Sequence, residues 1–105
     1  MRDHLIDFEN MPWIKTGNGV RCKIFNYEDQ QMRLVEFSEG FAETDWCARG
    51  HAGYVLEGSF AIDFNAKLER YKEGDVIFIP QNREDRHKSV LGKGERVLLL
   101  LFEIV

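Results

Sequence analysis

The sequence predicts an all-β protein, a small barrel or sandwich of short antiparallel strands, and three observations support this fold class. Apolar and polar residues alternate over residues 20–27, 32–37 and 59–64, as they do in strands that bury one face. Glycines and polar turn residues separate these stretches, whereas no stretch keeps a helical period for long. The 105 residues are 44% hydrophobic, which suits one core and leaves no room for a second domain.

The expected elements follow one another along a single domain, residues 1–105. Residues 1–19 form a short N-terminal arm, in which residues 3–11 suit a short helix or an extended segment, and the core barrel covers about residues 20–105. Gly58 marks a bend between two strands, because glycine tolerates backbone angles that other residues avoid. Strands are predicted at residues 20–27, 32–37, 54–56, 59–64, 67–71, 75–79 and 96–105.

The charge pattern excludes several classes of partner. The chain has 14 lysines and arginines against 18 acidic residues, and its basic residues are scattered rather than gathered into a patch for phosphates. The amino terminus carries charges where a signal peptide needs an apolar stretch. The longest apolar run, residues 97–102, is too short to cross a bilayer. We therefore expect a cytoplasmic protein with no nucleic-acid and no membrane partner.

The two cysteines, Cys22 and Cys47, could pair in principle. A chain without an export signal is expected in a compartment that keeps thiols reduced, so we predict that both are free. Cys22 alternates with Val20 and Ile24, which is typical of a small residue buried on one face of a strand.

Two segments carry the most specific patterns of the sequence. GHAGYVLEG, residues 50–58, and YKEGDVIFIP, residues 71–80, each join a glycine turn to a short apolar strand. His51 lies in the first segment and His87 follows the second. A small β-barrel would bring these two distant histidines into one cavity.

With these two phrases, residues 33–102 resemble a small single-domain cupin, a family of jelly-roll barrels of short antiparallel strands. In that family, two motifs commonly supply three histidines and a glutamate that hold a divalent metal. Alignment on Gly40 and Gly58 places Trp46–Ala48 where the family has its His-x-His, and His51 where it has the glutamate. His87 arrives two residues later than the second motif asks, which indicates a short loop insertion. The usual histidine pair is therefore missing.

The resemblance makes Cys47, His51 and His87 the candidate metal ligands. One thiolate and two imidazoles suit zinc or ferrous iron, with one position left open for water or a ligand. A second alignment starts the motif at His51 and takes Glu57 as the acid. In the alternative without a metal, Cys47 packs in the barrel wall, His51 bonds to a neighbouring strand and His87 is an exposed loop residue.

Four further residues are predicted to bind a ligand: Trp46, Arg49, Tyr54 and Phe78. Aromatic side chains suit the walls of a small-molecule cavity, and Trp46 adds a stacking face and an indole donor. Arg49 suits a carboxylate through two-pronged hydrogen bonds. The alternatives are that the aromatic residues belong to the core and that the arginine is solvated.

Two functional classes follow from the resemblance. The missing histidine pair favours a small-molecule-binding cupin with a degenerate, metal-binding or metal-free site, acting as a sensor or accessory protein. The retained His51 and His87 favour the alternative, a metal-dependent cupin enzyme of isomerase or dioxygenase type that acts on a small oxygen-bearing metabolite. The last strand is apolar on both faces, and burying its outer face predicts a homodimer.

Overall fold

The computed structural model describes residues 2–104 and confirms the all-β class. Its eight strands are antiparallel, and this part of the chain contains no helix long and apolar enough to cross a membrane. The strands are β1 (Ile14–Gly17), β2 (Val20–Tyr27), β3 (Gln30–Ser38), β4 (His51–Asp63), β5 (Leu68–Lys72), β6 (Val76–Ile79), β7 (Lys88–Val90) and β8 (Arg96–Ile104).

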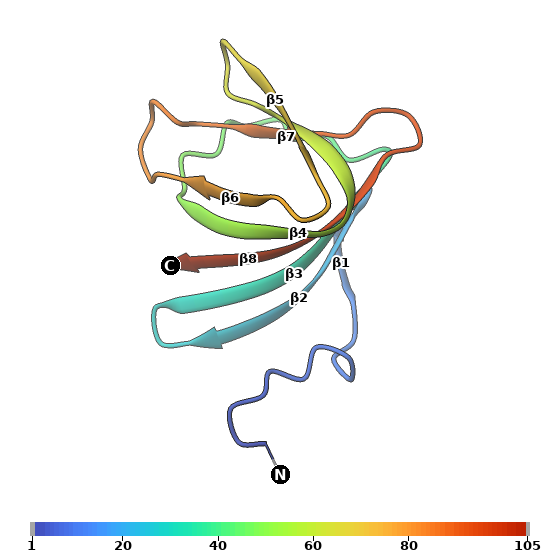
Figure 1. Cartoon of the computed structure of the whole chain (residues 1–105), viewed down its shortest axis with the longest axis vertical. Coiled ribbons are helices and arrows are strands. Elements are labelled where there is room, and N and C mark those ends of the chain that lie inside the picture. The colour runs from blue at the N-terminus through green and yellow to red at the C-terminus, as the bar shows by residue number, and fades with distance from the viewer. Residues whose placement is uncertain (1, 105) are drawn as a thin grey trace.

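The strands form a curved, open jelly roll in which β4 belongs to both sheets (Figure 1). The first half of β4 pairs with β8 and β6, and β8 continues through β3 and β2 to β1. The second half of β4 pairs with β5 and β7. Because β4 passes from one sheet into the other, it encloses the space between them.

Gly58 is the point at which β4 bends. The pairing of β4 with β8 shifts register between Val55 and Glu57, which is a β-bulge. Gly58 follows with a φ of 79°, and a Cβ there would lie 1.9 Å from the carbonyl oxygen of Arg96. The bend predicted from the sequence is confirmed, but the strand continues through it without a break.

The core lies between the sheets and is built by alternation along the strands. The buried apolar cluster consists of Val55, Phe60, Ile62, Ile77, Ile79, Val97 and Leu99. On β8, Val97 and Leu99 point inward, whereas Phe102 and Ile104 are exposed on the outer face. The last strand therefore has the two apolar faces that the sequence indicated, and its neighbours β3 and β4 lie on either side.

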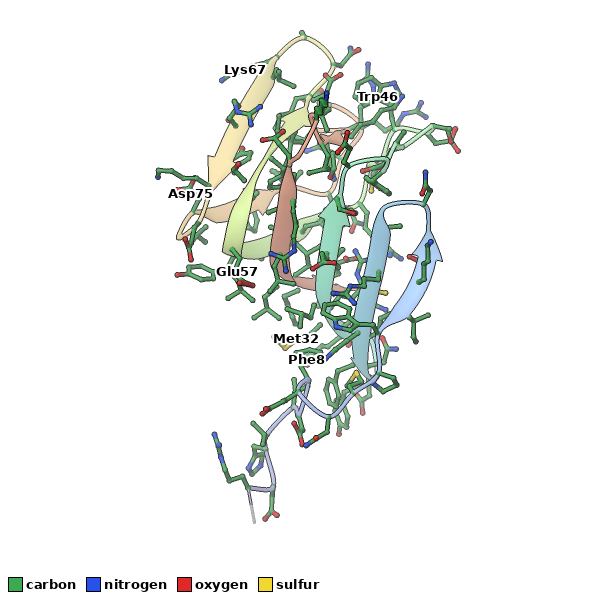
Figure 2. The ribbon with its side chains drawn as sticks, turned by 90° about the vertical axis from the view of Figure 1, so that its right-hand side faces the viewer. Phe8, Met32, Trp46, Glu57, Lys67 and Asp75 are labelled. Carbon is green, nitrogen blue, oxygen red and sulfur yellow. The ribbon has the colours of Figure 1, made fainter. Side chains whose placement is uncertain are left out.

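Two strands were not expected from the sequence. β1 lies within the segment assigned to the N-terminal arm, and the turn after Gly17 pairs it with β2. β7 has only three residues and lies in a stretch to which no strand was assigned. Residues 2–13 form turns rather than a helix, and the Lys23 ammonium holds them by donating to the carbonyl of Phe8 at 2.6 Å. Figure 2 shows Phe8 beside Met32 at the base of the barrel.

Candidate metal centre

A cavity of about 440 Å³ opens between the two sheets. Its walls are mainly apolar, from core positions of β3, β4, β6 and β8. Its polar and charged lining side chains include those of Arg33, Glu43, Cys47, Arg49, His51 and His87. A few converging polar groups in an otherwise apolar hollow are typical of a small-molecule site.

The backbone fixes Cys47 and His87 opposite each other. Their peptide groups exchange two hydrogen bonds, from Cys47 N to His87 O at 3.0 Å and from His87 N to Cys47 O at 2.9 Å. Directly opposed residues of an antiparallel pair point their side chains to the same face. This isolated bridge joins two loops that are 40 residues apart and delivers a thiol and an imidazole to one wall of the cavity.

His51 completes the cluster from the first position of β4. It is paired with Ile79 of β6, and its Nε2 atom lies 3.7 Å from the Cys47 Sγ atom. The rings of His51 and His87 meet edge to face, with centroids 5.1 Å apart. One donor atom from each of Cys47, His51 and His87 lies within 4.8 Å of the others.

His87 is held in the protonation state that a metal-binding histidine needs. Burial lowers the pKa of His87 below its usual 6.5, although the hydrogen bond to Asp85 opposes this, so the ring is neutral at pH 7. Its Nδ1 atom lies 3.1 Å from the carbonyl oxygen of Asp85 and donates to it. The Nε2 lone pair is then free to bind an ion.

Glu103 is a site residue that sequence reasoning missed. Its side chain is fully buried on the inward face of β8, near the C-terminal end of the strand. Its carboxylate is paired with Arg33, Arg49 and His51. Burial raises the pKa of Glu103, but the contacts with His51 and Arg33 outweigh it and bring the pKa to about 2. The signal that could have found it is the alternation of β8, which places an acid on the face that begins with Val97 and Leu99.

The predicted ligand-binding residues lie in different places. Arg49 lines the cavity. Trp46 is 37% exposed and stacks under the ammonium of Lys88, which lies 4.5 Å from the ring centroid. Tyr54 and Phe78 are 43% and 77% exposed on the outer face of the sheet, and neither lines the cavity. Ligand contacts by Trp46, Tyr54 and Phe78 stay predictions.

The donor set fits a tetrahedral ion. Zinc bonds of about 2.0–2.3 Å put donor atoms about 3.3–3.8 Å apart, and the 3.7 Å between Cys47 and His51 meets that spacing. The widest donor separation, 4.8 Å, requires a closure of about 1 Å. Cys47, His51 and His87 thus form a cluster that can hold a metal ion, and all three residues line the cavity.

Known proteins resemble this chain in sequence and in fold. The pectin degradation protein KdgF of Dickeya dadantii (strain 3937) is 32% identical over 85 residues, which cover 78% of this chain and 76% of that protein. The structure of KdgF from Halomonas sp. matches with a TM-score of 0.73 and 23% identity, over 93% of this chain and 92% of that one. An RmlC-like cupin from Shewanella frigidimarina NCIMB 400 matches with a TM-score of 0.76 and 17% identity, over 99% and 93% of the two chains. No protein-family model matches the sequence.

The open antiparallel jelly roll and the cluster inside it define a cupin-type barrel. Together with the relationship to KdgF over more than two thirds of both chains, they show that the chain belongs to the cupin superfamily. The resemblance expected from the sequence is confirmed.

Proposed function

We propose that this protein is a small-molecule-binding cupin whose barrel holds one divalent ion, zinc or ferrous iron, through Cys47, His51 and His87. The observation that carries the proposal is the convergence of three donors, from three separate loops and strands, within 4.8 Å. A thiolate and two imidazoles match the ligand preferences of both ions. When bound, such an ion would act as a Lewis acid toward an oxygen atom of the ligand.

The cavity around this cluster offers guanidinium groups to a ligand that carries a carboxylate. Arg33 and Arg49 both line the cavity and both contact the buried carboxylate of Glu103, while Glu43 also lines the cavity and balances the remaining positive charge. Guanidinium groups bind carboxylates in a planar, two-pronged arrangement. The remaining walls are apolar and suit the carbon skeleton of a small metabolite.

The name of the Dickeya relative refers to pectin degradation. Compounds released from pectin are therefore the first ligands to offer this protein. Binding would be measured as the change in melting temperature of the metal-loaded protein, because a ligand that binds only the folded state stabilises that state. A stabilisation that is reduced in Arg49→Met would support the role of Arg49, and an equal shift in both proteins would contradict it.

The second candidate is a metal-dependent cupin enzyme of isomerase or dioxygenase type, acting on a small oxygen-bearing metabolite. The observation that favours it is that Cys47, His51 and His87 all line a cavity of about 440 Å³, in which a metabolite could reach an ion held by them. The two candidates differ in turnover. Incubation of the loaded protein with a ligand found in the binding experiment, followed by mass and NMR analysis, separates a changed compound from one that is returned intact.

Elemental analysis of protein purified without an affinity tag tests the metal site. About one divalent ion per chain is expected in the parent, and its loss is expected in both His51→Ala and His87→Ala. His4→Ala is the matched control, because His4 is exposed in the arm. A parent that stays empty after incubation with zinc and iron would overturn the metal site and leave a metal-free binding barrel.

We also propose that two copies pair through the outer face of the sheet. Cross-strand partners form apolar rows there: Phe78, Ala52, Phe102 and Met32 in one, and Val76, Tyr54, Leu100 and Leu34 in the next. Contiguous exposed apolar surface of this kind marks an interface. A second copy is the partner that carries the same apolar face, so one contact buries both. A mass of one chain by light scattering at high concentration would contradict it.

The cytoplasm stays the proposed compartment. Cys22 is buried and Cys47 belongs to the cluster, and both are free. Free thiols, one of them a candidate metal ligand, are typical of proteins in a reducing compartment. Fractionation of cells that produce the full-length protein would test this, and recovery outside the cytoplasm would contradict it.

A further inference from the structure

Glu103 lies directly behind the cluster, outside the cavity. Its side chain has no exposed surface, and its two oxygens divide their contacts. Oε1 lies 3.0 Å from the Nε atom of Arg33 and 3.2 Å from the Nδ1 atom of His51, whereas Oε2 lies 3.2 Å from a terminal nitrogen of Arg49. A buried carboxylate thus joins β3, β8 and the start of β4 behind the cluster.

The contact between Glu103 and His51 constrains where the imidazole carries its proton. If Nδ1 were unprotonated, its lone pair would face a carboxylate oxygen at 3.2 Å in a buried place, and the two would repel each other. A proton on Nδ1 turns the same contact into an attraction. The contact is bent, since within residues 2–104 no acceptor lies in line with Nδ1. Hydrogen bonds in active sites are often long or poorly aligned before a ligand binds, and they tighten when it does.

We infer that Glu103 is a positioning residue that holds the Nδ1–H of His51 and so directs the Nε2 lone pair toward Cys47 and His87. His87 receives the equivalent support from the carbonyl of Asp85. The two histidines are then set in the same tautomer by two different acceptors. The tautomer of His51 does not depend on a metal, whereas its consequence for metal affinity rests on the proposed function.

A purely structural role for Glu103 predicts something different. In that case the carboxylate only neutralises Arg33 and Arg49, and its removal lowers stability without changing the proton position on His51. The tautomer of His51 separates the two roles. Long-range ¹H–¹⁵N NMR spectra of the imidazoles report it, because the nitrogen that carries the proton and the one that carries the lone pair differ in chemical shift.

The experiment compares metal-free parent, Glu103→Gln and Glu103→Leu at neutral pH. His51 is expected as the Nδ1–H tautomer in the parent and in Glu103→Gln, whose amide oxygen can still accept the proton. In Glu103→Leu the Nε2–H tautomer is expected to appear. Glu36→Leu is the matched control, because Glu36 also bridges two arginines, Arg21 and Arg96, but lies away from the cluster.

Zinc titration of the same proteins gives the second readout. Loss of a carboxylate that orients a metal-binding histidine weakens binding by about 10–100-fold, so this loss is expected in Glu103→Leu with substantial recovery in Glu103→Gln. A parent in which His51 carries its proton on Nε2 overturns the inference, even if Glu103→Leu fails to fold. An unchanged tautomer in folded Glu103→Leu does the same. Absence of zinc binding in a parent with the expected tautomer overturns the metal site and leaves the positioning role intact.

Discussion

The buried charge of Glu103 links the candidate site to the stability of the barrel. Its pKa of about 2 lies below the 4.5 of an unperturbed glutamate, because the contacts with His51 and Arg33 outweigh the effect of burial. A depressed folded-state pKa contributes stability that is complete above the unfolded-state pKa and is lost as the pH falls toward the folded-state value. The whole difference corresponds to on the order of 3 kcal/mol, of which the larger part is lost between pH 5 and pH 2.5.

Acid unfolding should therefore be steeper in the parent than in Glu103→Gln. The groups that face this carboxylate are Arg33, Arg49 and His51, and the amide cannot titrate. Urea unfolding between pH 5 and pH 2.5 measures the difference. The parent is expected to lose about 2–3 kcal/mol more than Glu103→Gln over that interval. Parallel curves for the two proteins would show that the charge of Glu103 contributes little.

The candidate ligands were predictable from the sequence, but the support behind them was not. The glycine spacing of the two motifs pointed to Cys47, His51 and His87, and the structure brings these residues together. Glu103 is distant from all three in sequence, and its partners depend on the pairing of β8 with β3 and β4. Pairing between distant strands is not encoded in local patterns, so the contact needed the structure.

At the scale of elements, the bend of β4 at Gly58 sets the shape of the cavity. An alanine there would need a backbone angle that costs about 1–2 kcal/mol, and its Cβ would also lie 1.9 Å from the Arg96 carbonyl oxygen. We expect Gly58→Ala to lower the free energy of unfolding by more than about 2 kcal/mol.

Gly74→Ala is the matched control for this change. Gly74 also has a positive φ, of 91°, but a Cβ there would meet no atom within 4 Å. Its substitution should cost only the conformational part, about 1–2 kcal/mol. Chemical denaturation measures both. Equal losses in the two variants would mean that the close approach of β4 and β8 at Gly58 is not a constraint.

The alternation of apolar and polar residues predicted most of the strands but missed the shortest ones. β2, β3 and β8 were predicted within a few residues because their apolar residues alternate or run continuously. β1 and β7 were missed, since strands of four and three residues are too short to show a period. The sequence alone also could not predict which side chains face inward, because that depends on the strand register. The register places Tyr54 and Phe78 on the outer face.

At the scale of the whole molecule, the outer face of the sheet determines association. Phe78 is 77% exposed at the β6 end of one of the apolar rows, so Phe78→Glu should leave the fold intact while placing a charge in the proposed interface. The variant is expected to shift from dimer to monomer in light scattering. Leu68→Glu is the control, because Leu68 is also an exposed apolar residue, 58% exposed, on β5 of the other sheet. An unchanged mass for Phe78→Glu would exclude this face.

Zinc K-edge X-ray absorption of the loaded protein tests most directly whether Cys47, His51 and His87 bind the same ion. The account predicts a first shell with one sulfur at about 2.3 Å and two imidazole nitrogens at about 2.0–2.1 Å. In Cys47→Ser the sulfur signal should disappear while the imidazole signals remain. A first shell without sulfur in the parent, or a sulfur signal that persists in Cys47→Ser, would contradict the proposed centre.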